Sequence, residues 1–269
     1  MITNRLNLGV KVPEVTLYFW IIKVLTTGMG ETTSDFLVHL FNPVIVVAVA
    51  GIILAASLLL QFAVRRYIPW IYWFAVVMVS VFGTMAADVL HIQFGIPYLV
   101  STVFFTVTLA AIFLVWYLSE KTLSIHSIYT SRRELFYWAT VLTTFALGTA
   151  TGDMTAITLH LGYLSSGYLF AVLIAIPAIG HYVIKGVLAE EHRYQSTNAV
   201  LAFWLAYILT RPLGASFADW MGVSHARGGL AWGTGLVSLV LFIIIIGFVG
   251  YLAVTHKDTE KHAGLKVIK

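Results

Sequence analysis

The sequence contains no cysteine and little charge. Of its 269 residues none is Cys, and only 10% are Asp, Glu, Lys or Arg. The absence of cysteine excludes disulfides, thiolate metal sites and cysteine-ligated iron–sulfur clusters. The shortage of charge excludes an ordinary soluble domain, in which about a quarter of the residues are charged. With 59% hydrophobic residues, the composition predicts an all-α membrane protein.

Apolar runs of about 20 residues recur along the whole chain, and each is long enough to cross a hydrocarbon core of roughly 30 Å. We therefore expect a single transmembrane domain, 1–269, with eight transmembrane helices. Their predicted ranges are 15–38, 43–64, 70–92, 96–118, 135–159, 162–186, 198–221 and 229–254. No cleavable signal peptide is expected, because residues 1–11 are polar and the apolar run that follows is too long.

Basic residues are divided unequally between the two sides of this topology. Thirteen of the sixteen Lys and Arg residues fall in the tails and the even-numbered connections, and the opposite side carries only Arg227. By the positive-inside rule both termini are expected in the cytoplasm, together with the connection 119–134 and the tail 256–269. The basic excess is thus a topology signal, so we expect the lipid bilayer as partner and no nucleic acid. The oligomeric state is not determined by the sequence.

One motif occurs four times: a Trp, a Gly ten residues later and an Asp five residues after the Gly. The copies are Trp20/Gly30/Asp35, Trp73/Gly83/Asp88, Trp138/Gly148/Asp153 and Trp204/Gly214/Asp219. They define two-helix repeats at about 14–66, 67–120, 133–193 and 197–255. All four enter the membrane in the same direction, so they are related by an axis along the membrane normal. This predicts a pseudo-fourfold bundle, and two pseudo-twofold halves fit equally well.

Two positions of the motif have structural interpretations. The tryptophans stand near the expected cytoplasmic interface, where aromatic residues anchor helices, so we expect interface anchors. These are Trp20, Trp73, Trp138 and Trp204. The glycines stand mid-helix, where small residues allow close packing of the odd-numbered helices. These are Gly30, Gly83, Gly148 and Gly214.

The motif acids are the first candidates for function, because an acid at membrane depth is costly and by default functional. They are Asp35, Asp88, Asp153 and Asp219. Their place in the outer part of the membrane leaves a solvated helix end as the alternative. A histidine follows each acid, and carboxylate oxygen with imidazole nitrogen suits Mn²⁺, Zn²⁺ or a similar divalent ion. The histidines are His39, His91, His160 and His225. Their spacing from the acids is irregular, so simple solvation of each histidine remains the alternative.

Three charged residues inside the spans are not repeated: Lys23, Glu31 and Arg211. With the motif acids they give five acids against two bases, which favours a path for cations or protons. If the repeats close into a ring, Arg211 reaches Glu31, and its planar fork suits a two-point bond. Lys23 is then the only unpaired base, and we expect it to extend toward the cytoplasmic interface.

The four copies of the motif resemble the bacterial family catalogued as a repeat of unknown function, number 347. That family is described as membrane-anchored or integral membrane proteins. The resemblance covers about 15–255 and implies four repeats in a bacterial inner membrane. It implies no activity, so no catalytic residue is transferred from it.

The first functional hypothesis is a transporter or channel for a divalent or proton-coupled cation, with the motif Asp residues and Glu31 as its binding elements. The second is a sensor or assembly protein that transports nothing. A redox or haem protein is a third hypothesis, but only His181 lies within a span as a candidate axial ligand. No Ser/His/Asp or His-Glu-x-x-His arrangement occurs, so we expect no enzyme.

Overall fold

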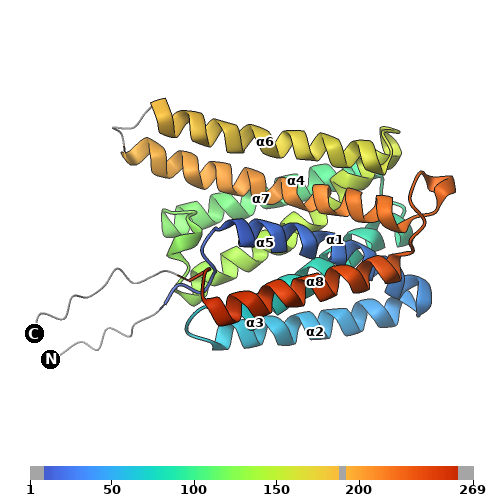
Figure 1. The fold of residues 1–269 in the computed structure, drawn as a ribbon, viewed down its shortest axis with the longest axis horizontal. Coiled ribbons are helices and arrows are strands. Elements are labelled where there is room, and N and C mark those ends of the chain that lie inside the picture. The colour runs from blue at the N-terminus through green and yellow to red at the C-terminus, as the bar shows by residue number, and fades with distance from the viewer. Residues whose placement is uncertain (1–8, 188–191, 260–269) are drawn as a thin grey trace, which may run out of the picture.

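The computed structural model describes residues 9–187 and 192–259, and the side chains of 181–197 are outside that description. In these residues the chain forms eight α-helices that all run along the long axis of the molecule (Figure 1). Their bounds are α1 Leu17–Leu40, α2 Pro43–Ala63, α3 Pro69–Asp88, α4 Tyr98–Glu120, α5 Ser131–Asp153, α6 Tyr163–Val187, α7 His192–Gly222 and α8 Thr234–Thr255. The structure therefore confirms the prediction of eight helices in four two-helix units.

Local sequence signals set several helix starts. Asn42 caps α2 by accepting a hydrogen bond from the backbone N–H of Val44 at 3.0 Å, and Pro43 occupies the first helical position. Pro69 starts α3 in the same way. Proline is favoured there because the first N–H groups of a helix have no intrahelical acceptor.

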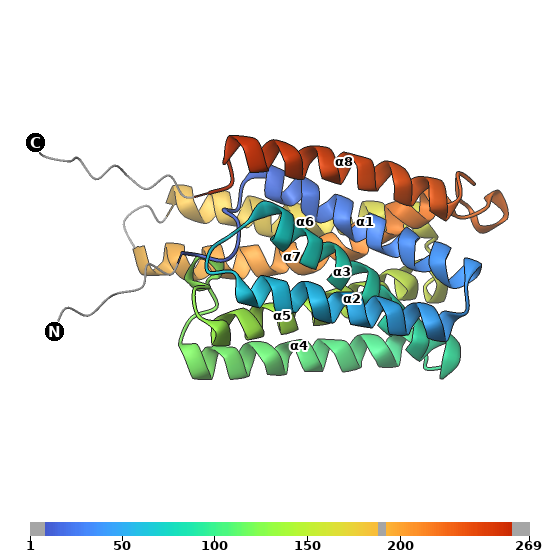
Figure 2. The ribbon, with the colours of Figure 1, turned by 90° about the horizontal axis from the view of Figure 1, so that it is seen from below.

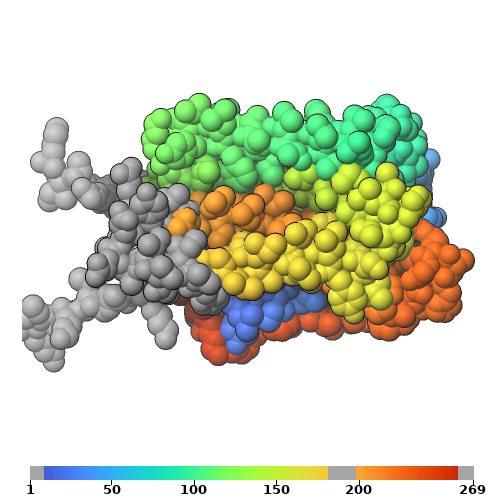
Figure 3. Space-filling view, turned by 90° about the horizontal axis from the view of Figure 1, so that it is seen from above, coloured from blue at the N-terminus to red at the C-terminus, as the bar shows by residue number. Residues whose placement is uncertain are grey.

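The odd-numbered helices form an inner ring. Each of α1, α3, α5 and α7 contacts the next, and α7 returns to contact α1. Each even-numbered helix packs on the odd helix that follows it, and α8 packs on α1. The even helices cover the outside of the bundle, as Figure 2 shows for α2, α4 and α8, and Figure 3 for α4 and α6. This closed ring is the pseudo-fourfold arrangement that the repeats predict.

Within the described part of the chain, six helices are long and apolar enough to cross a membrane: α2, α3, α4, α6, α7 and α8. The other two, α1 and α5, are of similar length, at 24 and 23 residues, but more polar. Both belong to the inner ring, where a helix need not be apolar all round because other helices shield it from lipid. Two of the eight predicted spans are therefore polar inner helices rather than apolar spans.

The motif glycines let the inner helices approach one another. A methyl group added at any of these glycines would overlap a side chain of a neighbouring inner helix. In each case the overlapped residue stands three positions before the motif glycine of its own helix. The contacts are Gly30 with Ser80, Gly83 with Phe145, Gly148 with Arg211 and Gly214 with Thr27. The same contact thus occurs at each step round the ring, which is the close packing that the sequence predicts.

The motif tryptophans are not interface anchors. Trp73, Trp138 and Trp204 are 2%, 3% and 4% exposed, and Trp20 is half-buried. In every repeat an aromatic residue stands directly before the motif tryptophan. Each tryptophan packs against that aromatic residue of the repeat before it in the ring, so Trp20 packs against the fourth repeat. The pairs are Phe19–Trp73, Tyr72–Trp138, Tyr137–Trp204 and Phe203–Trp20, with ring centroids 5.8, 5.7, 6.3 and 5.6 Å apart. The anchoring prediction fails because these positions face the next inner helix.

The two ends of the bundle differ. We call the end at which α1 begins and α8 ends the terminal end, and the opposite one the acidic end (Figure 1). At the terminal end Lys11 is buried and its ammonium group lies 2.5 Å from the Glu134 carboxylate, while Glu14 donates its backbone N–H to the carbonyl of Asp258. The predicted connection 119–134 contains one short 3-10 helix, Ile125–Ser127. Of the predicted tail 256–269, residues 260–269 lie outside the described residues.

Candidate metal site and axial charges

The four motif acids stand near the ends of the inner helices at the acidic end. Asp88 and Asp153 are the last residues of α3 and α5. Asp35 lies in the last turns of α1, and Asp219 lies in the last turn of α7. The charge of Glu31 acts on each of the four acids, and that of Asp35 acts on the other three. The ring thus gathers its acids at one end.

Two of the acids and one histidine come together most closely. A carboxylate oxygen of Asp88, a carboxylate oxygen of Asp153 and a ring nitrogen of His91 all lie within 4.8 Å of one another. Ser34 donates a hydrogen bond of 3.5 Å to Asp88 from the neighbouring α1. We refer to Asp88, His91 and Asp153 as the acidic trio.

Both acids of the trio are followed by a π-helical turn. The turn η1, Val89–Gln93, follows Asp88 and carries His91, and η3, Met154–Thr158, follows Asp153. Repeats one and four have no such turn, because α1 and α7 continue as α-helix past Asp35 and Asp219. Single π turns occur frequently at functional sites.

The hydrogen bonds around His91 leave one of its ring nitrogens free. Its Nε2 lies 2.6 Å from the Ser101 hydroxyl oxygen, and that hydroxyl donates its own hydrogen to the carbonyl of Tyr98 at 3.0 Å. If the Ser101 hydroxyl gives its hydrogen to that carbonyl, its oxygen accepts from Nε2–H and the lone pair lies on Nδ1. Among the described residues Nδ1 is buried without a partner. This is how a metal-ligating histidine is usually oriented by its outer neighbour.

The other three predicted histidines do not join the acids. His39 is exposed, and its Nδ1 lies 2.6 Å from the backbone carbonyl of Asp35. His225 is exposed and its Nδ1 lies 2.8 Å from the carbonyl of Gly229. His160 is exposed in a left-handed backbone conformation with φ of 54°. Among the described residues, only His91 brings a ring nitrogen close to two carboxylates, so only His91 fits a metal site. The side chain of His181 lies outside the described residues.

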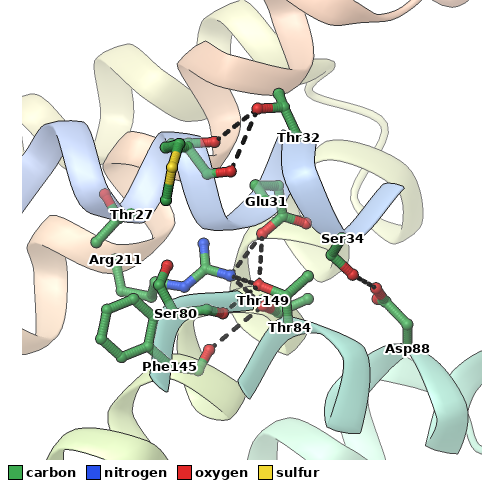
Figure 4. Close-up of polar contacts among 12 residues, drawn as sticks. Thr27, Glu31, Thr32, Ser34, Ser80, Thr84, Asp88, Phe145, Thr149 and Arg211 are labelled. Carbon is green, nitrogen blue, oxygen red and sulfur yellow. Dashed lines mark hydrogen bonds and ion pairs between the residues drawn. The ribbon is translucent and has the colours of Figure 1, made fainter. Parts of the chain in front are cut away.

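Below the acids, Arg211 fills the centre of the ring (Figure 4). Its Nη2 lies 2.5 Å from a carboxylate oxygen of Glu31, which is the contact that the sequence predicts. The same nitrogen donates to the hydroxyl of Thr149 at 2.6 Å and to that of Thr84. The predicted two-point bond is wrong, because one nitrogen faces Glu31 and the two threonines together.

The two threonines reveal a motif position that the sequence reading missed. Thr84 and Thr149 directly follow the motif glycines of repeats two and three, as Glu31 does in repeat one. The fourth repeat has Ala215 there. Arg211 therefore binds the residue after the glycine in each of the other three repeats, and alignment of the repeats alone would have shown polar residues at that position.

Lys23 does not extend to an interface. It is 1% exposed, and its ammonium nitrogen lies 3.9 Å from the ring centre of Phe145 and 4.3 Å from that of Tyr207. Among the described residues it has no hydrogen-bond acceptor. The prediction fails because Phe145 and Tyr207, on the facing helices α5 and α7, hold the amine on the axis.

The chain is similar to a known family of repeats. No curated protein matches the chain, and no solved structure matches it. A family model described as Repeat of Unknown Function (DUF347) matches four successive segments, residues 18–67, 71–122, 136–186 and 202–258. These segments cover more than half of the chain and agree with the four repeats of the bundle. The chain therefore belongs to the DUF347 repeat family.

Proposed function

We propose that this protein is a multi-pass membrane transporter or channel for a divalent cation, which binds first at the acidic trio. The observation that carries the proposal is the convergence of two carboxylates and a histidine with a free ring nitrogen. Oxygen with imidazole nitrogen suits Mn²⁺, Zn²⁺ and related ions. Asp35, Asp219 and Glu31 add negative charge around the trio and would attract the ion.

Arg211 supports a role for Glu31 in the path beyond the trio. Its guanidinium already neutralises Glu31 at the centre of the ring. A cation that moves inward must therefore replace Arg211 as the partner of Glu31, because two cations cannot share one buried carboxylate cheaply. On this proposal Arg211 closes the axis when no ion is passing and reopens it by moving away.

The same closure favours a second candidate function, a sensor that binds a metal and transports nothing. Arg211, Lys23 and Phe145 occupy the axis together, with the Arg211 guanidinium 5.3 Å from the Phe145 ring. A permanently closed axis would confine the ion to the acidic end. Flux measured across a membrane separates the two candidates.

We place the terminal end in the cytoplasm and the protein in a bacterial inner membrane. The distribution of basic residues supports this orientation. Because the chain has no cysteine, a His126→Cys variant carries a single label site on an exposed residue. An impermeant thiol reagent should label it only after cells are opened. Labelling of intact spheroplasts would reverse the orientation.

The function is tested with purified protein in liposomes that enclose a metal-sensitive dye. Mn²⁺ or Zn²⁺ added outside should enter, and Asp88→Asn or His91→Gln should weaken binding by at least about tenfold, since even outer-shell changes cost that much. His160→Gln is the matched control, because His160 is exposed and outside the trio.

Each outcome has a distinct meaning. Binding without entry would favour the sensor over the transporter. Equal binding by wild type, Asp88→Asn and His91→Gln would overturn the trio as the metal site. A loss in His160→Gln as large as that in His91→Gln would show that surface histidines, rather than the trio, take up the metal.

A further inference from the structure

Buried polar side chains continue from the centre of the ring to the terminal end. The Tyr72 and Tyr137 hydroxyls lie 2.5 Å apart. Tyr207 is fully buried, and its hydroxyl has no hydrogen-bond partner among the described residues. The ring of Tyr207 faces the amine of Lys23 at 4.3 Å. Buried tyrosines of three inner helices therefore extend toward Lys23, and the hydroxyls of Tyr72 and Tyr137 are hydrogen-bonded.

Buried polar side chains also connect Tyr72 with the terminal end. The ring of Tyr67 lies 5.5 Å from that of Tyr72, and its hydroxyl donates to the Asp258 carboxylate at 2.5 Å. Asp258 is buried, and it is flanked by the exposed Lys257. Burial raises the pKa of the Asp258 carboxyl above its usual range, which favours its protonated form.

The surroundings of Lys23 do not decide its charge. Burial without an acceptor disfavours an ammonium ion, and so does the nearby cation Arg211. Two aromatic faces favour the ammonium ion through their quadrupoles. The outer helices packed on α1 contribute no charge, because neither α2 nor α8 contains Asp, Glu, Lys, Arg or His.

We propose that Lys23 is a proton-binding site on the bundle axis, loaded from the terminal end through the hydroxyls of Tyr137 and Tyr207. Each transfer breaks one O–H bond and forms another, and the last forms an N–H bond on the Lys23 amine. Discharge reverses these steps, so no other reactant is needed. This deepens the proposed function by naming the proton as the second ion of the same axis.

Proton loading also has a consequence for Arg211. Lys23 and Arg211 both lie against Phe145. A proton on Lys23 therefore adds a second positive charge beside the guanidinium, and the repulsion favours movement of Arg211 away from its present place. Protonation of Lys23 and opening of the Glu31 pair are thereby coupled.

The test follows the protonation of Lys23 directly, in full-length protein labelled with ¹³C and ¹⁵N lysine. Lys23→Met identifies the Lys23 signal, and Lys23→Arg serves for assignment if that variant does not fold. We expect the Lys23 signal to pass reversibly between its neutral and charged positions in a pH range over which exposed Lys121 stays charged. A Lys23 signal that keeps one position there, or that titrates together with Lys121, overturns the proposal.

The route is tested separately with Tyr137→Phe, which removes a hydroxyl but keeps the ring. The variant should leave both end positions of the Lys23 signal and slow their exchange at least tenfold, whereas Tyr168→Phe, an exposed tyrosine, should not. Unchanged exchange in Tyr137→Phe overturns the tyrosine route. Mn²⁺ binding measured on the same samples reports on the acidic trio, so loss of either property is distinguished from loss of the other.

Discussion

The two pairs of repeats share one scaffold but carry different polar side chains. Repeats two and three supply the acidic trio and the two π-helical turns. Repeats one and four supply the buried charges Lys23, Glu31 and Arg211. The backbone ring, with its glycine and tryptophan contacts, is common to all four. Chemistry is therefore added to a symmetric frame by changing single positions.

The axis explains why the symmetry must break. The residues three before the glycines all pack against the glycine of a neighbouring inner helix, and they are Thr27, Ser80, Phe145 and Arg211. An arginine in all four repeats would place four cations at one buried point, where Glu31 is the carboxylate in contact with the present arginine. One arginine can instead bind the equivalent positions of the other three repeats, as Arg211 does.

The largest expected effect tests the charges of repeats one and four. Glu31→Gln or Arg211→Gln should each destabilise the protein by about 3–5 kcal/mol, because either leaves a buried charge without its partner. The double substitution should cost less than the sum of the two. Thermal unfolding in detergent and the yield of monodisperse protein measure this.

An additive double mutant would show that the pair contributes no coupling, and Arg211 would then be held by the threonines alone. Thr84→Val with Thr149→Val serves as control. That variant keeps both charges of the pair and removes the two hydroxyl acceptors of Arg211, together with the 3.4 Å hydrogen bond from Thr84 to Glu31. It should cost less than loss of Glu31.

The second effect tests the frame that all repeats share. Gly148→Ala should destabilise by about 1–3 kcal/mol, because its methyl group meets Arg211 and Pro212 and forces the helices apart. Gly247→Ala in α8 is the matched control, since nothing lies within 4 Å of a methyl group there. Equal tolerance of both would mean that α5 and α7 are less closely packed than the structure has them.

The sequence predicted the frame because its signals repeat. Three fixed motif positions and four copies define the helices, the ring and the glycine contacts, and non-repeated charges at similar depth predict the Glu31–Arg211 pair. The tryptophans were misjudged because sequence gives the depth of a residue but not the direction in which it points. Lys23 was misjudged for the same reason: its two aromatic partners come from α5 and α7, far away in the chain.

The site was less predictable than the frame. His39 and His91 follow their acids at similar spacing, yet only His91 turns toward a second acid. The π turn and Ser101 decide this, and neither is visible as a pattern in one sequence.

The third effect tests the orientation of the trio in repeats two and three. Ser101→Ala removes the acceptor that fixes the His91 ring, so Mn²⁺ or Zn²⁺ affinity should fall by about 10–100-fold. Thr106→Ala is the control, because its exposed hydroxyl on the same helix donates to the carbonyl of Thr102 and lies outside the trio. Isothermal titration measures the affinities. If Ser101→Ala binds like wild type, the tautomer of His91 is set by something other than this serine.

The smallest effect tests how far the asymmetry extends toward the terminal end. Asp258 is the last residue of the fourth segment that the family model matches. Burial raises the pKa of its carboxyl group. A raised pKa in the folded state means that stability is greatest when the acid is protonated and is lost as pH rises. Asp258→Asn keeps an acceptor for Tyr67 and has no charge to bury. It should therefore melt higher than wild type at pH 7, and the two should converge below about pH 3.9, where aspartate is protonated even when unfolded. Melting curves from pH 3 to pH 8 measure the difference, and an advantage for wild type that grows with pH would show that the Asp258 carboxylate is stabilised by its surroundings.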